Sequence, residues 1–341
     1  MKFADEFNNA VTPRAALLVI GVLALQLLFI ASYVGALHNP KPKDVPFGVV
    51  APVPALAQQT TQQLNGLPSS PVDARTVADE RTARQQILNR DIDGALVVDP
   101  RGTTDTLLVA SGGGTVLATA LETIATEADG VQKRTVRTVD VAPASSQDFD
   151  GLSSFYLVVG WCVGGYLCAS IMSISAGSKP ASPQRAAIRL GTMALVSIAG
   201  GLGGALIIGD SILGALPGSF WALTGLGALV TFAVGAITLA LEELTGVVGI
   251  GLAVLLIVVA GNPSAGGAFP LPMLPPFWQA IGPWLPPGAG TWVARSIAYF
   301  KGNDVTQSLL VLSAWAVVGV AVTLLVSSLR EKKRNAAEAP L

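Results

Sequence analysis

Side chains with the chemistry for catalysis or metal binding are few and scattered in this sequence. His38 is the only histidine and lies beside an apolar segment, so neither a Ser-His triad nor a histidine-bearing metal cluster can be assembled. Asp91, Asp93, Asp99 and Asp105 fall around predicted turns, where a solvated surface is the usual role and a weak calcium site is the alternative. We therefore predict no catalytic residue, no metal site and no enzymatic activity.

Gly112–Gly114 is the segment closest in composition to a phosphate-binding loop. It precedes a predicted helix, whose N-terminus can hold an anion, but it lacks the lysine and hydroxyl of a phosphate loop. A plain turn is predicted there, and no cofactor-binding residue is predicted in this chain. Cys162 and Cys168 lie on different faces of an apolar helix, so we interpret them as small core residues and not as a disulfide or metal pair.

The composition is that of an integral membrane protein. The 341 residues are 51% hydrophobic and 13% charged, whereas about a quarter of the residues in a soluble protein are charged. The mean hydropathy is +0.58. The net charge of -1 conceals a segregation, because more than half of the charged residues lie between Lys41 and Asp150. Nothing in this balance indicates nucleic acid binding, and the partners expected from composition are membrane lipids.

Six apolar segments predict transmembrane helices, at residues 15–37, 154–176, 190–212, 220–241, 246–261 and 306–329. The first segment has an alternative interpretation as a cleavable signal peptide, since Val34-Gly35-Ala36 is similar to a cleavage site. Its apolar region is longer than the roughly 7 to 15 residues usual in a signal, which favours a retained helix. The segment at 246–261 is short and is followed at once by prolines and glycines.

The distribution of positive charge predicts the orientation of these helices. Cytoplasmic loops carry an excess of lysine and arginine. Most basic residues outside the polar region fall on one predicted side, and only Arg295 and Lys301 fall on the other. The first group contains Lys2, Arg14, Lys179, Arg185, Arg189, Arg330, Lys332, Lys333 and Arg334. We therefore expect a cytoplasmic N-terminal segment (1–14), a basic cytoplasmic tail (330–341) and an extracytoplasmic region at residues 38–153.

The region at residues 38–153 has the alternating pattern of a small α/β domain. Strands are predicted near 45–50, 72–77, 95–98, 106–110 and 135–141, with helices near 55–65, 81–90 and 112–128. Such alternation indicates one sheet covered by helices. The predicted fold class is therefore an α-helical polytopic membrane protein with six transmembrane helices, one before and five after an extracytoplasmic α/β domain.

A Pro/Gly/Trp-rich segment at residues 262–290 interrupts the five-helix region (154–329). Its prolines remove backbone donors and prevent a regular spanning helix. Two interpretations are open: interfacial packing, with Trp278, Trp284 and Trp292 among lipid head groups, or a role in the translocation path. The candidate residues for a path or outer gate are Asn262, Pro263, Gly266, Gly267, Trp278 and Trp284.

Two further sets of residues stand out within the predicted bundle. The pairs Gly160 and Gly164, and Gly200 and Gly204, have the four-residue spacing that lets helices pack closely, although glycine is also simply common in membrane helices. Asp210, Glu242 and Glu243 are the candidate polar or coupling residues. Carboxylates at helix ends are more often solvated boundary residues. An alternative interpretation of Glu242 and Glu243 is that they contact a cytoplasmic partner.

Three stretches carry a resemblance to a known family: Phe47-Gly48-Val49-Val50, the segment from Ile87 to Pro100, and the run from Asn262 to Gly290. With the order of helix, domain and five helices, they are similar to type-2 ABC transporter permeases. Specifically, the chain resembles the bacterial branch of phage-infection-protein-like (Pip) proteins and ABC exporter permeases. The resemblance implies a bacterial cytoplasmic membrane protein that pairs as a homodimer or with a related permease.

The same resemblance implies a separate nucleotide-binding ATPase subunit. This chain contains no phosphate loop of the form G-x-x-x-x-G-K-[ST], so ATP would be bound by that partner. By the resemblance, the ATPase docks on the short cytoplasmic loops and on the N-terminal segment that contains Phe3 and Phe7.

Three functional hypotheses follow from the sequence. The leading one is an exporter permease for a hydrophobic or amphipathic compound, because the spans are rich in glycine and poor in fixed charge. The alternative is a non-transport surface or assembly protein of the phage-receptor kind, whose external domain binds a partner by strand addition. A proton-coupled transporter is third, since titratable groups within the spans are scarce.

Overall fold

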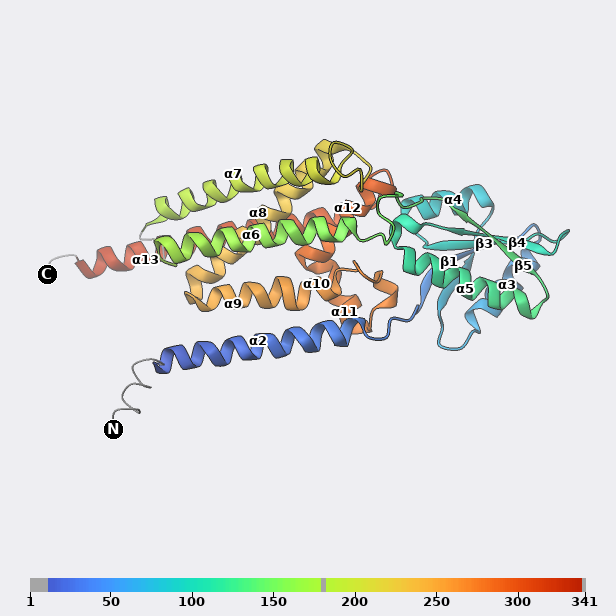
Figure 1. Cartoon of the computed structure of the whole chain (residues 1–341), viewed down its shortest axis with the longest axis horizontal. Helices are drawn as coiled ribbons and strands as arrows, with labels where there is room; N and C mark the ends of the chain where they lie inside the picture. The colour runs from blue at the N-terminus through green and yellow to red at the C-terminus, as the bar shows by residue number, and fades with distance from the viewer. Residues whose placement is uncertain (1–11, 179–181, 339–341) are drawn as a thin grey trace.

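Long apolar helices form a bundle, and a separate sheet domain stands at one end of it (Figure 1). The computed structural model describes residues 12–178 and 182–338. Within these residues, five helices are long and apolar enough to cross a membrane. They are α2 (Pro13–Leu37), α6 (Ser153–Ala176), α7 (Pro183–Ile208), α8 (Phe220–Thr245) and α13 (Thr306–Glu338). This is the architecture of a multi-pass membrane protein. Phe3 and Phe7, assigned to partner docking by the resemblance, lie outside the described residues.

The fifth predicted span, at 246–261, corresponds to an apolar helix shorter than the five long ones. It runs through α9 (Val248–Val254), the π-helical segment η2 (Leu255–Gly261) and α10 (Asn262–Ser264). Together these reach from Val248 to Ser264, which is below the 18 residues that the other five helices exceed. Pro263 lies in the last turn, where it cannot donate a backbone hydrogen bond to continue the helix.

Helix α8 is the centre of the bundle, with α6, α7 and α13 packed around it. It is the most buried of the five long helices. Helix α2 is the least buried, and its main contacts are with α9, η2 and α10. Small residues allow this close packing. Trp161 of α6 fits between Gly204 of α7 and Gly227 of α8, where an added Cβ would come within 2.4 Å of its ring. The Trp161 indole donates to the Gly200 carbonyl oxygen at 3.0 Å.

The predicted role of Gly160 and Gly164 in helix packing is wrong within the described chain. A Cβ at either position would meet nothing within 4 Å. The neighbouring Gly165 makes the contact instead, since its Cβ would lie 2.7 Å from the Thr231 carbonyl oxygen of α8. One residue along a helix turns the side chain by about 100°, so a one-residue error in phase selects a different face. Gly200 and Gly204 do lie at a helix contact, as predicted.

The sheet domain contains five strands in the order β2-β1-β3-β4-β5. Its strands are β1 (Val45–Val50), β2 (Val72–Thr76), β3 (Gly94–Val97), β4 (Thr104–Val109) and β5 (Thr135–Asp140), and its helices are α3 (Pro54–Asn65), α4 (Glu80–Asn89) and α5 (Thr115–Val131). All five strands lie at or near the stretches where alternation predicts them. The β3–β4 pair is antiparallel and the other three pairs are parallel.

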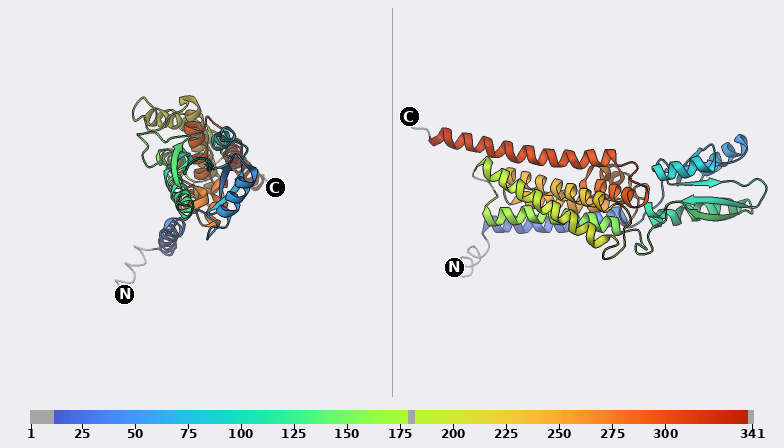
Figure 2. Two further views of the ribbon diagram at one scale, coloured as in Figure 1. Left: turned by 90° about the vertical axis from the view of Figure 1, so that its right-hand side faces the viewer. Right: turned by 90° about the horizontal axis from the view of Figure 1, so that it is seen from above.

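Apolar side chains cover both faces of this sheet. Leu64 of α3 and Leu121 of α5 pack on one face, and Ile87 of α4 packs on the other. Figure 2 shows the domain projecting from the bundle, away from the end where α2 begins and α13 ends. Met273, which belongs to the Pro/Gly/Trp-rich segment, is part of the first of these two cores. The membrane part of the chain therefore contributes directly to the core of the sheet domain.

The α7–α8 contact gives a test of this packing. In Gly201→Ala the new Cβ would lie 2.4 Å from the Thr224 carbonyl oxygen, so we expect overpacking that costs about 1–3 kcal/mol. Gly203→Ala on the same helix is the matched control, because its Cβ meets nothing within 4 Å. Thermal unfolding of the purified chain in detergent should show a lower midpoint for Gly201→Ala alone. Equal midpoints for the two variants would contradict the α7–α8 packing.

Candidate functional site

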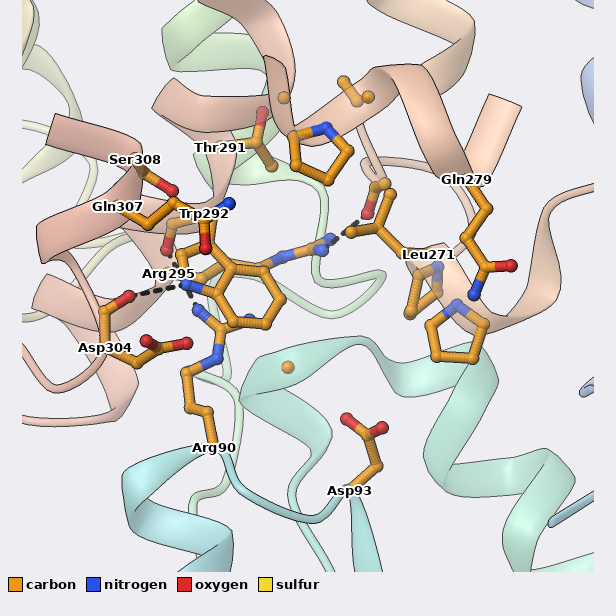
Figure 3. A pocket seen from close by; sticks show the side chains of 18 of the residues that line it. Arg90, Asp93, Leu271, Gln279, Thr291, Trp292, Arg295, Asp304, Gln307 and Ser308 are labelled. Atoms are coloured by element: carbon orange, nitrogen blue, oxygen red, sulfur yellow. Dashed lines mark hydrogen bonds between the residues drawn. The ribbon is translucent and has the colours of Figure 1, made fainter. Parts of the chain in front are cut away.

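A cavity of about 350 Å³ lies where the sheet domain meets the bundle (Figure 3). Five parts of the chain line it: the start of β1, the loop after α4, Gly113 before α5, the Pro/Gly/Trp-rich segment, and the region of α12 (Pro286–Tyr299) with the start of α13. Its charged lining residues are Asp44, Arg90, Asp93, Arg295 and Asp304. The cavity therefore combines groups that are far apart in the sequence at the junction of two structural units.

Arg90 connects the sheet domain to α12. It ends α4 in the left-handed conformation (φ 66°), which directs its side chain toward α12. The guanidinium carbon lies 3.2 Å from the centroid of the Trp292 ring, and Nη1 donates to the Trp292 carbonyl oxygen at 3.0 Å and to Ser296 Oγ at 2.7 Å. Such stacking of a partly desolvated cation contributes about 1–2 kcal/mol. Arg90 thus holds the two units together at the edge of the cavity.

Arg295 holds the irregular backbone beside the cavity. Its side chain is only 4% exposed and donates to the carbonyl oxygens of Gly266 at 2.6 Å, Gly267 at 2.8 Å and Gly151 at 3.2 Å. Gly266 has φ +69°, a conformation that glycine adopts most easily. A Cβ at Gly267 would lie 2.3 Å from the Phe155 ring, so only glycine fits there. Arg295 therefore fixes a tight turn of the Pro/Gly/Trp-rich segment against the start of α6.

The charges of Arg90 and Asp93 lie in a poorly solvated place. Burial raises the pKa of Asp93 to about 6, and the nearby Arg90 opposes that rise. Burial also lowers the pKa of Arg90 to about 9, with a further lowering by the like charge of Arg295, while Asp93 and Asp304 act in the opposite direction. Among the described residues, no ion pair of 4 Å or less joins Arg90 to either aspartate. The opposite charges thus attract each other across a gap.

The structure places the six candidate path residues in different surroundings. Gly266 lines the cavity, whereas the other five are not among its lining residues. Asn262 and Pro263 lie in α10, and Pro263 is buried. Trp284 is 59% exposed, and its carbonyl oxygen accepts from Trp315 Nε1 at 2.8 Å. Trp278 lies in α11 (Pro276–Ile281) and is partly exposed.

Trp292 belongs to the cavity and not to the group of tryptophans that could extend into head groups. One face of its ring is occupied by Arg90, and Nε1 donates to the Asp304 carbonyl oxygen at 2.7 Å. No local pattern separates Trp292 from Trp278 and Trp284, because its partner Arg90, at the end of α4, is 202 residues away along the chain.

The three candidate bundle carboxylates divide into two groups. Asp210 is exposed, as expected of a boundary residue. Glu242 and Glu243 are 0% and 1% exposed, so their predicted solvation is wrong. Ser173 of α6 donates to Glu242, and Arg330 of α13 pairs with Glu243 at 2.9 Å. The pair joins α8 to its neighbours and has no exposed surface for a cytoplasmic partner.

A turn of the backbone explains this burial. Gly246 ends α8 with φ +69° and lets α9 fold back along it. Gly249 of α9 lies so close that its Cβ would meet the Glu242 backbone nitrogen at 2.4 Å. The end of α8 is therefore covered by the next helix.

Asp105 also differs from its predicted solvated role. It is 1% exposed, and its carboxylate accepts from Arg134 Nε at 2.8 Å. Its other oxygen accepts from the Asp99 backbone nitrogen at 2.7 Å. Asp105 thus fixes the β3–β4 turn, whereas Asp91 is exposed as predicted.

Sequence reasoning missed the three charged residues most important to the cavity. Arg90 enters the sequence analysis only as part of the segment that carries the family resemblance, and Arg295 only as a loop charge. Asp93 is predicted to be a solvated turn residue, whereas the structure places it where burial raises its pKa. An available indication for Arg295 was its setting, because small and apolar residues surround it in the run Thr291-Trp292-Val293-Ala294-Arg295-Ser296. An arginine in such a run is buried only if carbonyls or carboxylates receive its donors.

Replacement of Arg90 tests its role as the connection between the two units. Arg90→Lys keeps the charge but lacks the planar fork that stacks on Trp292, so we expect a loss of about 1–2 kcal/mol. Arg84→Lys on the same helix is the control, because Arg84 forms only a solvent-exposed pair with Glu80. Thermal unfolding and limited proteolysis between the units are the measurements. A midpoint for Arg90→Lys equal to that of Arg84→Lys would show that the contact contributes nothing.

The pKa of Asp93 predicts a pH-dependent stability. Because its folded-state pKa of about 6 exceeds the value of about 3.9 for a free aspartate, the folded state binds this proton more tightly. The contribution to stability is full below about pH 4 and is lost as the pH rises through 6. Asp93→Asn should therefore raise the unfolding midpoint more at about pH 7.5 than at about pH 4. Asp91→Asn should show no such difference, and an equal effect of Asp93→Asn at both pH values would contradict the burial of this charge.

Comparison with known protein families gives a match that covers most of the chain. A family model described as ABC-2 family transporter protein matches residues 15–325. No curated protein and no solved structure matches the chain. The matched region includes α6, α7 and α8, most of α2 and α13, the sheet domain and every residue named above as lining the cavity. The chain therefore belongs to the ABC-2 transporter family of membrane permeases.

Proposed function

We propose that this chain is the permease subunit of an ABC-type exporter that moves a hydrophobic or amphipathic compound across the bacterial cytoplasmic membrane. The observation that carries the proposal is the family match over residues 15–325. Permeases of this family generally work with a separate ATPase subunit, and this chain has no phosphate loop of its own. In the proposed complex, two permease halves, identical or related, share the ATPase subunits.

The distribution of charge supports an orientation for this exporter. Arg185 and Arg189 lie near the start of α7, and Arg330, Lys332 and Lys333 lie in the last turns of α13, all at the end of the bundle opposite the sheet domain (Figure 1). By the positive-inside rule this end faces the cytoplasm. The sheet domain and the cavity then lie on the extracytoplasmic side.

The composition of the bundle supports an apolar or amphipathic cargo. Its central helix α8 carries its two carboxylates only at the proposed cytoplasmic end, and one of them is paired with Arg330. The remaining buried part of α8 consists of small and apolar residues with a few threonines. A path along such a surface solvates fixed charge poorly, so a cargo that crosses it must be largely apolar. The polar cavity at the other end would meet such a cargo where it leaves the bundle.

Isolation of the full-length chain from its native membrane tests the proposed function. A tagged chain purified in mild detergent should bring with it a subunit that contains a phosphate loop, and the complex in lipid nanodiscs should hydrolyse ATP faster than that subunit alone. Replacement of the phosphate-loop lysine in the partner is the control, since hydrolysis should stop while the complex remains. Recovery of the intact chain with no nucleotide-binding subunit would contradict the proposal.

A further inference from the structure

Opposite charges face the cavity without contacting each other. Arg90 uses only Nη1 for its bonds to Trp292 and Ser296, so within the described chain its Nε and Nη2 atoms have no hydrogen-bond partner. The Asp93 carboxylate likewise accepts no hydrogen bond from the described residues, and Figure 3 shows it directed into the cavity from below. The site therefore has unused donors on one side and unused acceptors on the other.

The free donors of Arg90 and the free acceptors of Asp93 are open to the cavity, where a ligand can reach them. A charge withdrawn from bulk water requires a close partner to recover its lost hydration, and a distant opposite charge supplies only part of that energy. Arg295 adds a second positive charge to the lining; it is 4% exposed, and its Nε atom has no hydrogen-bond partner among the described residues. A ligand that brings both a donor and an acceptor would complete these groups.

We propose that the cavity binds a zwitterionic head group, with its ammonium toward Asp93 and its anionic oxygen toward the free donors of Arg90. A ligand with a single charge fits less well, since a cation would leave Arg90 unmatched and repel it, and an anion would do the same to Asp93. Asp44 and Asp304 are the other carboxylates of the lining, and both are exposed to water. Their charges are therefore screened more than that of Asp93.

The walls of the cavity indicate that the head group belongs to an amphiphile. Apolar residues of the Pro/Gly/Trp-rich segment also line the cavity, namely Pro270, Leu271, Pro272 and Pro283. A volume of about 350 Å³ is at the small end of ligand pockets and holds a head group but not a long apolar chain. Nearby in the same segment, Phe277 and Trp284 are 63% and 59% exposed. An apolar body can follow this surface while its head remains in the cavity.

The inference rests on the proposed function where it makes the amphiphile a cargo, but head-group binding itself does not require transport. The zwitterion has two possible sources with the same chemistry: a membrane lipid with an ethanolamine phosphate head, or a soluble molecule with an ammonium and an anionic oxygen. Both would engage Asp93 and Arg90 in the same way, so the experiment has to separate them.

Calorimetric titration of the full-length chain in detergent tests the proposal with four probes. Lysophosphatidylethanolamine carries both charges, lysophosphatidylglycerol carries only the negative one, dodecylamine carries only the positive one, and phosphoethanolamine is the head group alone. We expect the first to bind at least about tenfold more tightly than the two singly charged amphiphiles. Displacement of it by phosphoethanolamine would assign a soluble source, and failure of displacement would assign a lipid source, each in agreement with a zwitterion site.

Asp93→Asn and Asp91→Asn form the matched pair of variants for this titration. Asp93→Asn should weaken binding of lysophosphatidylethanolamine about tenfold or more, and Asp91→Asn, two residues away and exposed, should leave it unchanged. Loss of folding does not confuse the result, because Asp93→Asn is expected to be the more stable protein at neutral pH. Unchanged affinity in Asp93→Asn, or a singly charged probe that binds as tightly as the zwitterion, would overturn the proposal.

The failure of this inference and that of the proposed function are distinguishable. A chain that lacks an ATPase partner but binds the zwitterion selectively contradicts export alone. A chain that activates its ATPase but shows no preference for the zwitterion contradicts the head-group site alone.

Discussion

The end of the bundle beside the sheet domain depends on one buried guanidinium. The prolines and glycines of residues 262–290 break the helical ladder where Gly266 and Gly267 are buried, so the carbonyls of that segment need donors from the protein. Arg295 supplies hydrogen bonds to Gly266, Gly267 and Gly151 at once. Because arginine has several donors in a rigid plane and keeps its charge, one side chain can hold the turn of the irregular segment and the start of α6 together.

The position of the cavity follows from that constraint. Arg295 fixes α12 against the turn, and Trp292 lies about one helical turn earlier on the same helix. Trp292 in turn provides the ring and the carbonyl oxygen that receive Arg90 from the sheet domain. The chain of contacts from Gly266 through α12 to α4 is therefore continuous. It explains why the cavity lies between the two units and why residues far apart in the sequence line it.

Features that depend on local periodicity could be predicted from the sequence, and features that depend on distant partners could not. Alternation in the sheet domain is a property of each strand, so strands such as Val45–Val50 and Thr135–Asp140 lie where the pattern places them. Spacing shows that glycines recur on a helix but not which face meets a neighbour, which is why Gly165 and not Gly164 contacts α8. Glu242 is buried because α9 folds back at Gly246, and no pattern within α8 records that turn. The burial of Arg295 could not be predicted for the same reason, because the carbonyl groups that accept its hydrogen bonds lie near residues 151 and 266, far from it in the sequence.

The same contacts limit how the two units can move relative to each other. Arg295 holds the Gly266 carbonyl from α12, and Trp292 of the same helix holds the Arg90 guanidinium, so a displacement of α12 that keeps the second contact also displaces Arg90. The gap between Arg90 and Asp93 would then change, although both residues belong to the sheet domain and Asp93 does not contact α12 by any ion pair or hydrogen bond in the described chain. A molecule that bridges Arg90 and Asp93 binds more tightly to the conformation in which the distance between them fits it. Such a difference in affinity between two conformations is what a ligand needs to shift a conformational equilibrium. If the cavity binds the proposed head group, its occupation and the position of α12 are linked through the Arg90–Trp292 contact, and weakening that contact weakens the link in both directions.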